Sequence, residues 1–237
     1  MTEPGPIALV GSGEYLPVML DVERHLITGR PPRYVQLATA AAQEGEESLR
    51  RWHSLGAEQA RRLGVEQVVV DVRSRADADD PSNAAAIAGA GLIYLSGGDP
   101  GFLGRTLRGT AVWDAIVDEW RSGAALAGCS AGAMAMTTWV PTPMHPRSGV
   151  GDGTGLLSHL RVLPHFDQMT RFMPKSVVQL LMTPPDEGWL IGVDENTALV
   201  GGVEEWEVAG SGQVWRFGPD GRTAYSAGER VSTPFSD

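Results

Sequence analysis

A serine framed by two glycines stands between a short apolar run and a stretch of small residues. The pattern is Gly-x-Ser-x-Gly, at Gly128, Ser130 and Gly132, and it follows the apolar run 124–127. In a nucleophile elbow the serine occupies a strained strand-to-helix turn, where larger flanking side chains would clash with the neighbouring strand and helix. The pattern therefore predicts Ser130 as the nucleophile of a covalent hydrolysis. The alternative is a glycine-rich turn whose serine only caps the following helix.

Cys129, immediately before Ser130, is a rival nucleophile because thiols are more nucleophilic than hydroxyls. The glycine frame is centred on Ser130, so we expect Cys129 to point away from the apex of the turn as a small buried residue. Cys129 is the single cysteine of the chain, which excludes an intrachain disulfide bond.

A serine nucleophile needs a general base. His165 follows the apolar residues Val162 and Leu163, where a strand is expected to end, and a buried base belongs at such a strand tip. His165 is therefore the best candidate. His25 and His53 lie in helical stretches near the start of the chain, and His145 lies in a proline-rich loop.

Acyl chemistry also needs backbone N–H groups aimed at the developing oxyanion. The amide of Ala131, directly after the nucleophile, is one candidate. The other is Gly98, in the turn 96–99, because a glycine lets the backbone approach a substrate closely. Asp99 in the same turn is expected to cap a helix and is also a candidate for binding substrate.

Strand-like and helical patterns alternate in the first half of the chain and must position these residues. Apolar runs lie at 7–10, 34–37, 68–70, 92–95 and 124–127, and helical patterns at 44–63, 83–90 and 112–121. This repetition predicts a three-layer α/β fold, in which helices cover both faces of a mostly parallel central sheet. Ligands of such sheets bind beyond the carboxyl ends of the strands, where the turns with Ser130 and Gly98 fall.

The second half of the chain is expected to add a long loop and further strands. Residues 137–155 are rich in Pro, Gly, Thr and Ser and predict a loop, and a helix is expected at 168–182. From Leu190 onward, short apolar runs predict strands and C-terminal β-hairpins that extend the sheet or form a small second one. We expect a single domain over residues 1–237.

Composition and charge argue against several functional classes. The 237 residues carry a formal net charge of -10, whereas general binding to nucleic acid or to anionic membranes needs basic patches. The start of the chain lacks the pattern of a signal peptide, and no run of about 18 apolar residues could span a membrane. We therefore expect a cytoplasmic protein that binds neither nucleic acid nor membranes.

Several segments, in order, resemble the dipeptidase E and cyanophycinase family of serine peptidases. They are 7–14, ending Gly-Ser-Gly-Glu; 95–99, with Gly-Gly-Asp; the elbow 128–133; 153–157; 164–166, Pro-His-Phe; and 192–198, Gly-Val-Asp-Glu-Asn-Thr-Ala. The resemblance implies the family's class I glutamine amidotransferase-like (flavodoxin-like) fold. It also implies Ser130 as nucleophile, His165 as general base and Gly98 as an oxyanion donor. Hydrolysis of small or aspartyl-type peptides, with no metal or organic cofactor, is the activity it implies.

Arg171, six residues after His165, matches an arginine that follows the histidine in cyanophycinase-like members. Its guanidinium is a candidate to hold a substrate carboxylate in a bidentate pair. The alternative is a structural ion pair.

Such sites also contain an acid that orients the imidazole, and at the position of this acid the chain departs from the family's pattern. The family places it in the loop after the elbow, where this chain has residues 145–148 and no Asp or Glu. Asp152 is the first acid after the elbow, and an insertion in the loop would bring it into this catalytic role. Glu14, at the tip of the first strand, is another candidate partner and a candidate for binding substrate. Asp167 is expected to point away from the imidazole.

Three functions are compatible with these residues. The first is a serine peptidase that cleaves a small peptide or amide through a Ser130 acyl-enzyme, as a monomer or homodimer. The second is a degraded relative that binds a ligand or partner without efficient turnover, because the orienting acid is missing from its place. The third is acyl transfer, although a serine in place of the usual cysteine argues against glutamine amidotransfer.

Overall fold

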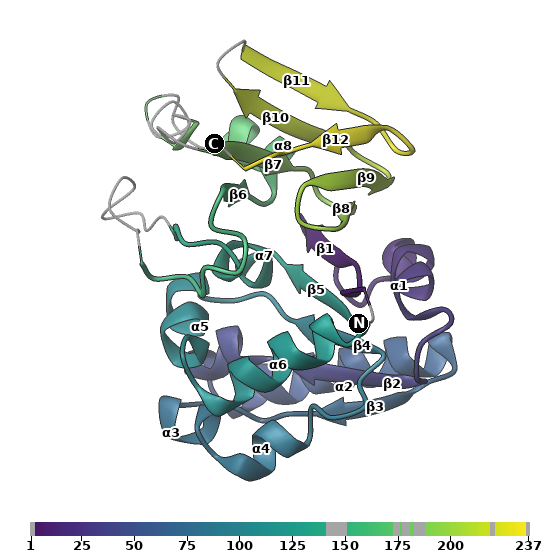
Figure 1. Cartoon of the computed structure of the whole chain (residues 1–237), viewed down its shortest axis with the longest axis vertical. Helices are drawn as coiled ribbons and strands as arrows, with labels where there is room; N and C mark the ends of the chain where they lie inside the picture. Colours follow the sequence, from purple (N-terminus) through teal and green to yellow (C-terminus); the bar gives the residue numbers. More distant parts are fainter. Residues whose placement is uncertain are drawn as a thin grey trace.

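Two β-sheets form the framework of the protein (Figure 1). The computed structural model describes residues 3–140, 151–172, 176, 181–182, 188–218 and 221–235. Within these residues the larger sheet has eight strands, in the order β12-β9-β8-β1-β5-β4-β2-β3. Its parallel part consists of β1 (Ile7–Val10), β5 (Ala125–Cys129), β4 (Leu92–Leu95), β2 (Arg33–Leu37) and β3 (Glu66–Val69). The carboxyl ends of these strands therefore meet at one edge of the sheet.

Helices cover both faces of the larger sheet, because successive residues of a strand point to opposite sides. One face packs against α1 (Leu20–Ile27) and α2 (Glu46–Leu63). The opposite face packs against α3 (Arg75–Ala78), α4 (Pro81–Ala85), α5 (Pro100–Leu107), α6 (Ala111–Arg121) and α7 (Ala131–Ala135). Two 3-10 turns, η1 (Pro17–Met19) and η2 (Thr39–Glu44), follow β1 and β2. The three-layer α/β fold predicted from the sequence is confirmed.

The C-terminal strands divide between the two sheets. Three of them extend the larger sheet in antiparallel fashion beside β1: β8 (Thr197–Gly201), β9 (Glu205–Gly210) and β12 (Arg230–Ser232). The smaller sheet has the order β11-β10-β7-β6, with β6 (Leu160–Leu163), β7 (Trp189–Val193), β10 (Val214–Gly218) and β11 (Gly221–Tyr225). In Figure 1 it lies at the end of the molecule opposite α3 and α4. The predicted C-terminal strands are confirmed.

The two sheets share a hydrophobic core. Ile191 and Val193 of β7 belong to the same cluster of fully buried side chains as Ile7 and Leu9 of β1. This shared burial holds β1, near the start of the chain, against β7, near its end. The same packing of β1 against β7 fixes the loops of the larger sheet relative to the loops of the smaller sheet.

The segments around the long loop are described only in part. The helix α8 (Phe166–Phe172) begins two residues before the helix expected at 168–182. Most of residues 173–182, and residues 141–150 with His145, lie outside the described residues.

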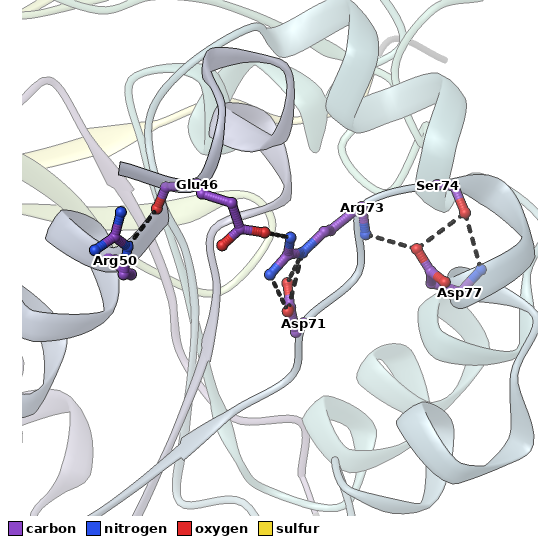
Figure 2. A network of polar contacts seen from close by, with 6 residues as sticks. All are labelled: Glu46, Arg50, Asp71, Arg73, Ser74 and Asp77. Atoms are coloured by element: carbon purple, nitrogen blue, oxygen red, sulfur yellow. Dashed lines mark hydrogen bonds and ion pairs between the residues drawn. The ribbon is translucent and has the colours of Figure 1, made fainter. Parts of the chain in front are cut away.

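An exposed network of charged groups ties the loop after β3 to the start of α2 (Figure 2). Arg73 donates to both carboxylate oxygens of Asp71 at 2.7–3.0 Å, and it also pairs with Glu46. Asp77 accepts from the Ser74 hydroxyl and from the Arg73 amide, and these bonds lower the pKa of its carboxyl. Exposed ion pairs add little stability individually, so the network mainly orients these loops.

The layer of α1 and α2 buries a carboxyl group, that of Glu23, against the sheet. Glu23 is 1% exposed, and the Tyr34 hydroxyl donates to its Oε2 at 3.0 Å. Burial raises the pKa of Glu23 from 4.5 to about 7, because the charged form loses its hydration. Glu23 therefore keeps its proton in the folded protein at pH values where the unfolded chain has released it.

We predict that Glu23 makes the protein less stable as pH rises. Between pH 4.5 and about 7 the folded state binds more protons than the unfolded state, so the free energy of unfolding falls in this window. The neutral Glu23→Gln variant lacks this dependence. Relative to Glu23→Gln, the wild type should lose about 3 kcal/mol between pH 4.5 and pH 8. Urea unfolding at both pH values measures the difference, with the exposed Glu47→Gln as control. If the free energies of unfolding of the wild type and Glu23→Gln differ by the same amount at both pH values, the prediction is contradicted.

Candidate active site

Ser130 lies on the sharp turn that joins β5 to α7. Its backbone has φ 50° and ψ -107°, a strained conformation for a residue with a side chain, and its N–H donates to the Val10 carbonyl at 2.9 Å. A Cβ at Gly128 would lie 2.5 Å from the backbone of Gly132, and one at Gly132 would lie 2.3 Å from the Leu95 carbonyl oxygen. Both positions therefore require glycine, because any side chain would clash with the neighbouring backbone. The Ser130 side chain makes no capping bond to the helix, so the helix-cap interpretation finds no support.

His165, the predicted base, lies beside Ser130. It follows β6, also has a left-handed φ of 50°, and places its Nε2 3.0 Å from the Ser130 Oγ. Its side chain is 41% exposed, so the imidazole can be reached from solvent. The structure therefore brings together two predicted residues that are 35 positions apart in the sequence.

Glu195, which was not among the predicted site residues, occupies the other side of the imidazole. Its Oε1 lies 2.9 Å from His165 Nδ1. A carboxylate can only accept, so Nδ1 carries the hydrogen and Nε2 is free to accept the Ser130 hydroxyl hydrogen. Glu195 lies in the turn between β7 and β8, where the chain crosses from the smaller sheet to the larger one.

The prediction of Asp152 as the orienting acid is corrected by this geometry. Asp152 lies 3.1 Å from the guanidinium of Arg105 on α5, and its backbone packs against Gly104 of the same helix. The loop is held there because the Thr154 N–H donates to the Ala135 carbonyl at 2.7 Å. The loop after the elbow therefore folds along α5, and its acid is bound to a surface arginine.

A signal for Glu195 was present in the sequence. The segment 194–196 directly follows the apolar run that forms β7, which places its side chains beyond a strand tip. The sequence-based candidates for the acid were Asp152, in the loop after the elbow, and Glu14, at the tip of β1. Glu195 follows the tip of β7 in the same way that Glu14 follows the tip of β1.

Neighbouring residues hold the Glu195 turn in place. Asp167 points to this turn rather than to the imidazole, and its Oδ1 accepts the Glu195 N–H at 3.0 Å. Asp194 accepts the Gln213 N–H at 3.0 Å and the Trp215 indole N–H at 3.2 Å. Burial raises the pKa of the Asp194 carboxyl, and the charge of Asp167 adds to this effect. Glu195 is thus fixed through its backbone as well as through its contact with His165.

The two predicted oxyanion donors have unpaired amides within the described part of the chain. In the turn after β4, the amides of Ser96, Gly97 and Asp99 each donate to an acceptor of the fold at 2.8–3.0 Å, but the Gly98 amide does not. The Ala131 amide, at the start of α7, is also without a described acceptor. Because neither N–H has an acceptor among the described residues, both stay candidates for binding an oxyanion.

The close approach of Gly98 to η2 explains its residue type. It has φ 139°, and a Cβ there would lie 2.4 Å from the Ala40 backbone. Asp99 is the N-cap of α5, since its Oδ1 accepts the Phe102 N–H at 2.8 Å. The expected capping role of Asp99 is confirmed, and its part in substrate binding stays a prediction.

The remaining predicted residues lie around this centre. Cys129 is fully buried, and its thiol donates to Glu14 Oε2 at 2.8 Å. Burial, followed by the charge of Glu14, raises the pKa of the Cys129 thiol well above its ordinary value. Glu14 does not touch His165. Arg171 is exposed on α8, six residues after His165, and its role in substrate binding stays a prediction.

Among the described residues, no group of three or more His, Cys, Asp and Glu side chains could hold a metal ion. No described helix is both long and apolar enough to cross a membrane.

The chain is similar to several known proteins. The model of peptidase family S51 matches residues 55–207. Cyanophycinases of Trichormus variabilis and of a Nostoc species are each 28% identical over an alignment of 199 residues, and the alignment covers 78% of this chain. The match spans 63% of each cyanophycinase, so the chain corresponds to less than two thirds of those relatives.

Two solved structures are also similar. The crystal structure of a peptidase from an acI-B1 Actinobacterium has 41% identity and a TM-score of 0.90, with 97% of both chains covered. A protein assigned as peptidase E from Listeria monocytogenes has 16% identity and a TM-score of 0.62, covering 87% of this chain and 98% of its own. The second similarity shows the shared fold alone.

We predict that Glu195, and not Asp152, supports the reactivity of Ser130. In Glu195→Gln the amide can donate to Nδ1, which favours the wrong imidazole tautomer, so labelling of Ser130 by a fluorophosphonate should slow about 1,000-fold. Asp152→Asn changes a pair on α5 and should alter the rate less than about threefold. The labelling rates of the two variants are measured by gel fluorescence and by intact mass spectrometry. A larger loss in Asp152→Asn than in Glu195→Gln would contradict the assignment.

Proposed function

Because the chain belongs to peptidase family S51, we propose that it is a serine-type peptidase whose reaction runs through Ser130, His165 and Glu195. The observation that carries the proposal is the continuous chain of hydrogen bonds from Ser130 Oγ through the imidazole to the Glu195 carboxylate, at 3.0 and 2.9 Å. This arrangement is the one that activates a weak hydroxyl nucleophile.

In the first half of the reaction, the Ser130 Oγ attacks the carbonyl carbon of the scissile peptide bond. The hydroxyl proton passes to His165 Nε2, and the Glu195 carboxylate stabilises the imidazolium that forms. The carbonyl oxygen becomes an oxyanion that the Gly98 and Ala131 amides bind. Loss of a single such donor costs about 100- to 1,000-fold in kcat in other enzymes.

In the second half, the tetrahedral intermediate collapses and the C–N bond breaks. His165 gives its proton to the leaving amine, and an acyl-enzyme is left on Ser130. A water molecule then gives a proton to His165 and attacks the ester carbon. The acid product leaves, and the Ser130 hydroxyl recovers its proton.

For the substrate we propose a small peptide, with aspartyl-type peptides as the leading class. The support is the membership in family S51 and the similarity to the cyanophycinases. Arg171, on the helix that begins just after His165, is the proposed partner of a substrate carboxylate. Asp99 is the proposed contact for a substrate amine. Glu14 is not included, because both its oxygens already accept hydrogen bonds from the protein.

The geometry supports a catalytic site over a degraded relative. The degraded relative rests on the absence of an acid from residues 145–148, in the loop after the elbow. Glu195 on His165 Nδ1 removes that reason, and Ser130 in place of cysteine again argues against glutamine amidotransfer. A cytoplasmic location and a monomeric or homodimeric state remain predictions.

We predict that Ser130 forms the acyl-enzyme. A fluorophosphonate should label the wild type at Ser130, and Ser130→Ala should abolish labelling and lower peptide hydrolysis at least about 1,000-fold. A panel of Asp-X, β-Asp-X and N-terminally blocked peptides, followed by mass spectrometry, tests activity and specificity together.

The exposed Ser82→Ala, on α4, is the matched control and should behave as wild type. Folded wild type that is neither labelled nor active on the panel would contradict the proposal. Labelling at a serine other than Ser130 would do the same.

A further inference from the structure

Glu14 joins the two turns that carry the oxyanion donors. It lies just beyond β1, and its Oε1 accepts the Gly97 N–H at 3.0 Å. Its Oε2 accepts the Cys129 thiol hydrogen at 2.8 Å. Gly97 directly precedes Gly98, and Cys129 directly precedes Ser130. One carboxylate therefore holds the turn after β4 and the elbow after β5 from the same point.

The space around Gly97 shows how closely the three segments approach. A Cβ at Gly97 would lie 2.7 Å from Glu14 Oε1 and 3.6 Å from the Cβ of Ser130. The Gly97 backbone thus fills the gap between the Glu14 carboxylate and the nucleophile. If the carboxylate moved away, the Gly97 N–H would lose its hydrogen-bond acceptor.

Glu14 is itself anchored by the residue that follows it. Tyr15 is 1% exposed, has a left-handed φ of 62°, and its hydroxyl lies 2.6 Å from the Ser96 Oγ. The Tyr15 carbonyl accepts a hydrogen bond from Arg62 at 3.0 Å. Tyr15 and Glu14 therefore contact consecutive residues, Ser96 and Gly97, of the same turn.

The thiol of Cys129 is suited to act as a donor. It is fully buried, and burial together with the nearby Glu14 charge raises its pKa well above the ordinary value, so it keeps its hydrogen. The bond to Glu14 then fixes the last residue of β5. The thiol is used for structure here, since its hydrogen-bond partner is Glu14, whereas those of His165 are Ser130 and Glu195.

We propose that Glu14 is a positioning residue, which sets the spacing between Gly97 and Cys129 so that the Gly98 and Ala131 amides converge on the oxyanion. The inference rests on the proposed function, because it assumes that these two amides bind the oxyanion. Oxyanion donors act only within a narrow distance, about 2.7–3.1 Å from the oxygen. A small rotation of the turn after loss of its acceptor would therefore lower the rate of the chemical step more than the binding of the reagent.

The kinetics of a fluorophosphonate test this without knowledge of the natural substrate. Its phosphonyl oxygen occupies the oxyanion position during attack, so kinact reports the donors and KI reports initial binding. We expect Glu14→Ala to lower kinact about 10- to 100-fold with KI within about threefold. Glu14→Gln keeps an oxygen acceptor for the Gly97 N–H and should recover kinact to within about threefold of wild type. The exposed Glu47→Ala, on α2, controls for loss of a carboxylate and should match wild type.

The Gly97→Ala variant gives a second test. Its Cβ would press on the Glu14 carboxylate, so it should lower kinact in the wild-type background and lower it much less in the Glu14→Ala background. Thermal unfolding of every variant is measured alongside, and the comparison uses variants that stay folded at the assay temperature.

Three results would each overturn the inference. The first is a kinact of Glu14→Ala equal to that of the wild type, and the second is an equal loss of kinact in Glu14→Ala and Glu14→Gln. The third is that the effects of the Glu14 and Gly97 substitutions on kinact are additive. These outcomes differ from failure of the proposed function, which would appear as an unlabelled Ser130 in the folded wild type.

Discussion

The His165 imidazole is the point at which the two sheets of the protein are joined chemically. It follows β6 of the smaller sheet, contacts Ser130 at the end of β5 in the larger sheet, and contacts Glu195 where the chain passes from β7 to β8. Three distant segments must therefore arrive at one place with an accuracy of a few tenths of an ångström. The shared core of β1 and β7 provides this accuracy, because close-packed interiors resist small displacements.

Backbone strain is concentrated in the same region. Ser130, His165 and Asn196, next to the acid, all have φ between 50° and 55°, which is unusual for residues with side chains. Such conformations persist only when the surroundings impose them. Here the surroundings are close contacts between loops: a Cβ at Gly13 would lie 2.4 Å from Asn196 Oδ1. The tip of β1 thus supports the acid on one side and, through Glu14, the elbow on the other.

The parts of this site that could be predicted are those encoded locally. Ser130 and its glycines form a short motif whose steric reason is visible in the sequence, and Gly98 lies in an equally local turn. Glu195 was missed and Asp152 was wrong because both depend on long-range packing. Spacing along the chain does not show that the loop with Asp152 binds Arg105, nor that the crossing from β7 to β8 brings Glu195 to His165. In the same way, the C-terminal strands were predicted, but their division between two sheets was not.

The central claim is that Glu195 fixes the tautomer of His165 so that Nε2 faces Ser130 without a hydrogen. NMR of protein with ¹⁵N-labelled histidine measures this directly, once the His165 signals are assigned with a His165→Gln variant. The account predicts that neutral His165 carries its hydrogen on Nδ1 and that Glu195→Gln shifts the hydrogen toward Nε2. A hydrogen on Nε2 in the wild type, or a tautomer that Glu195→Gln leaves unchanged, would contradict it.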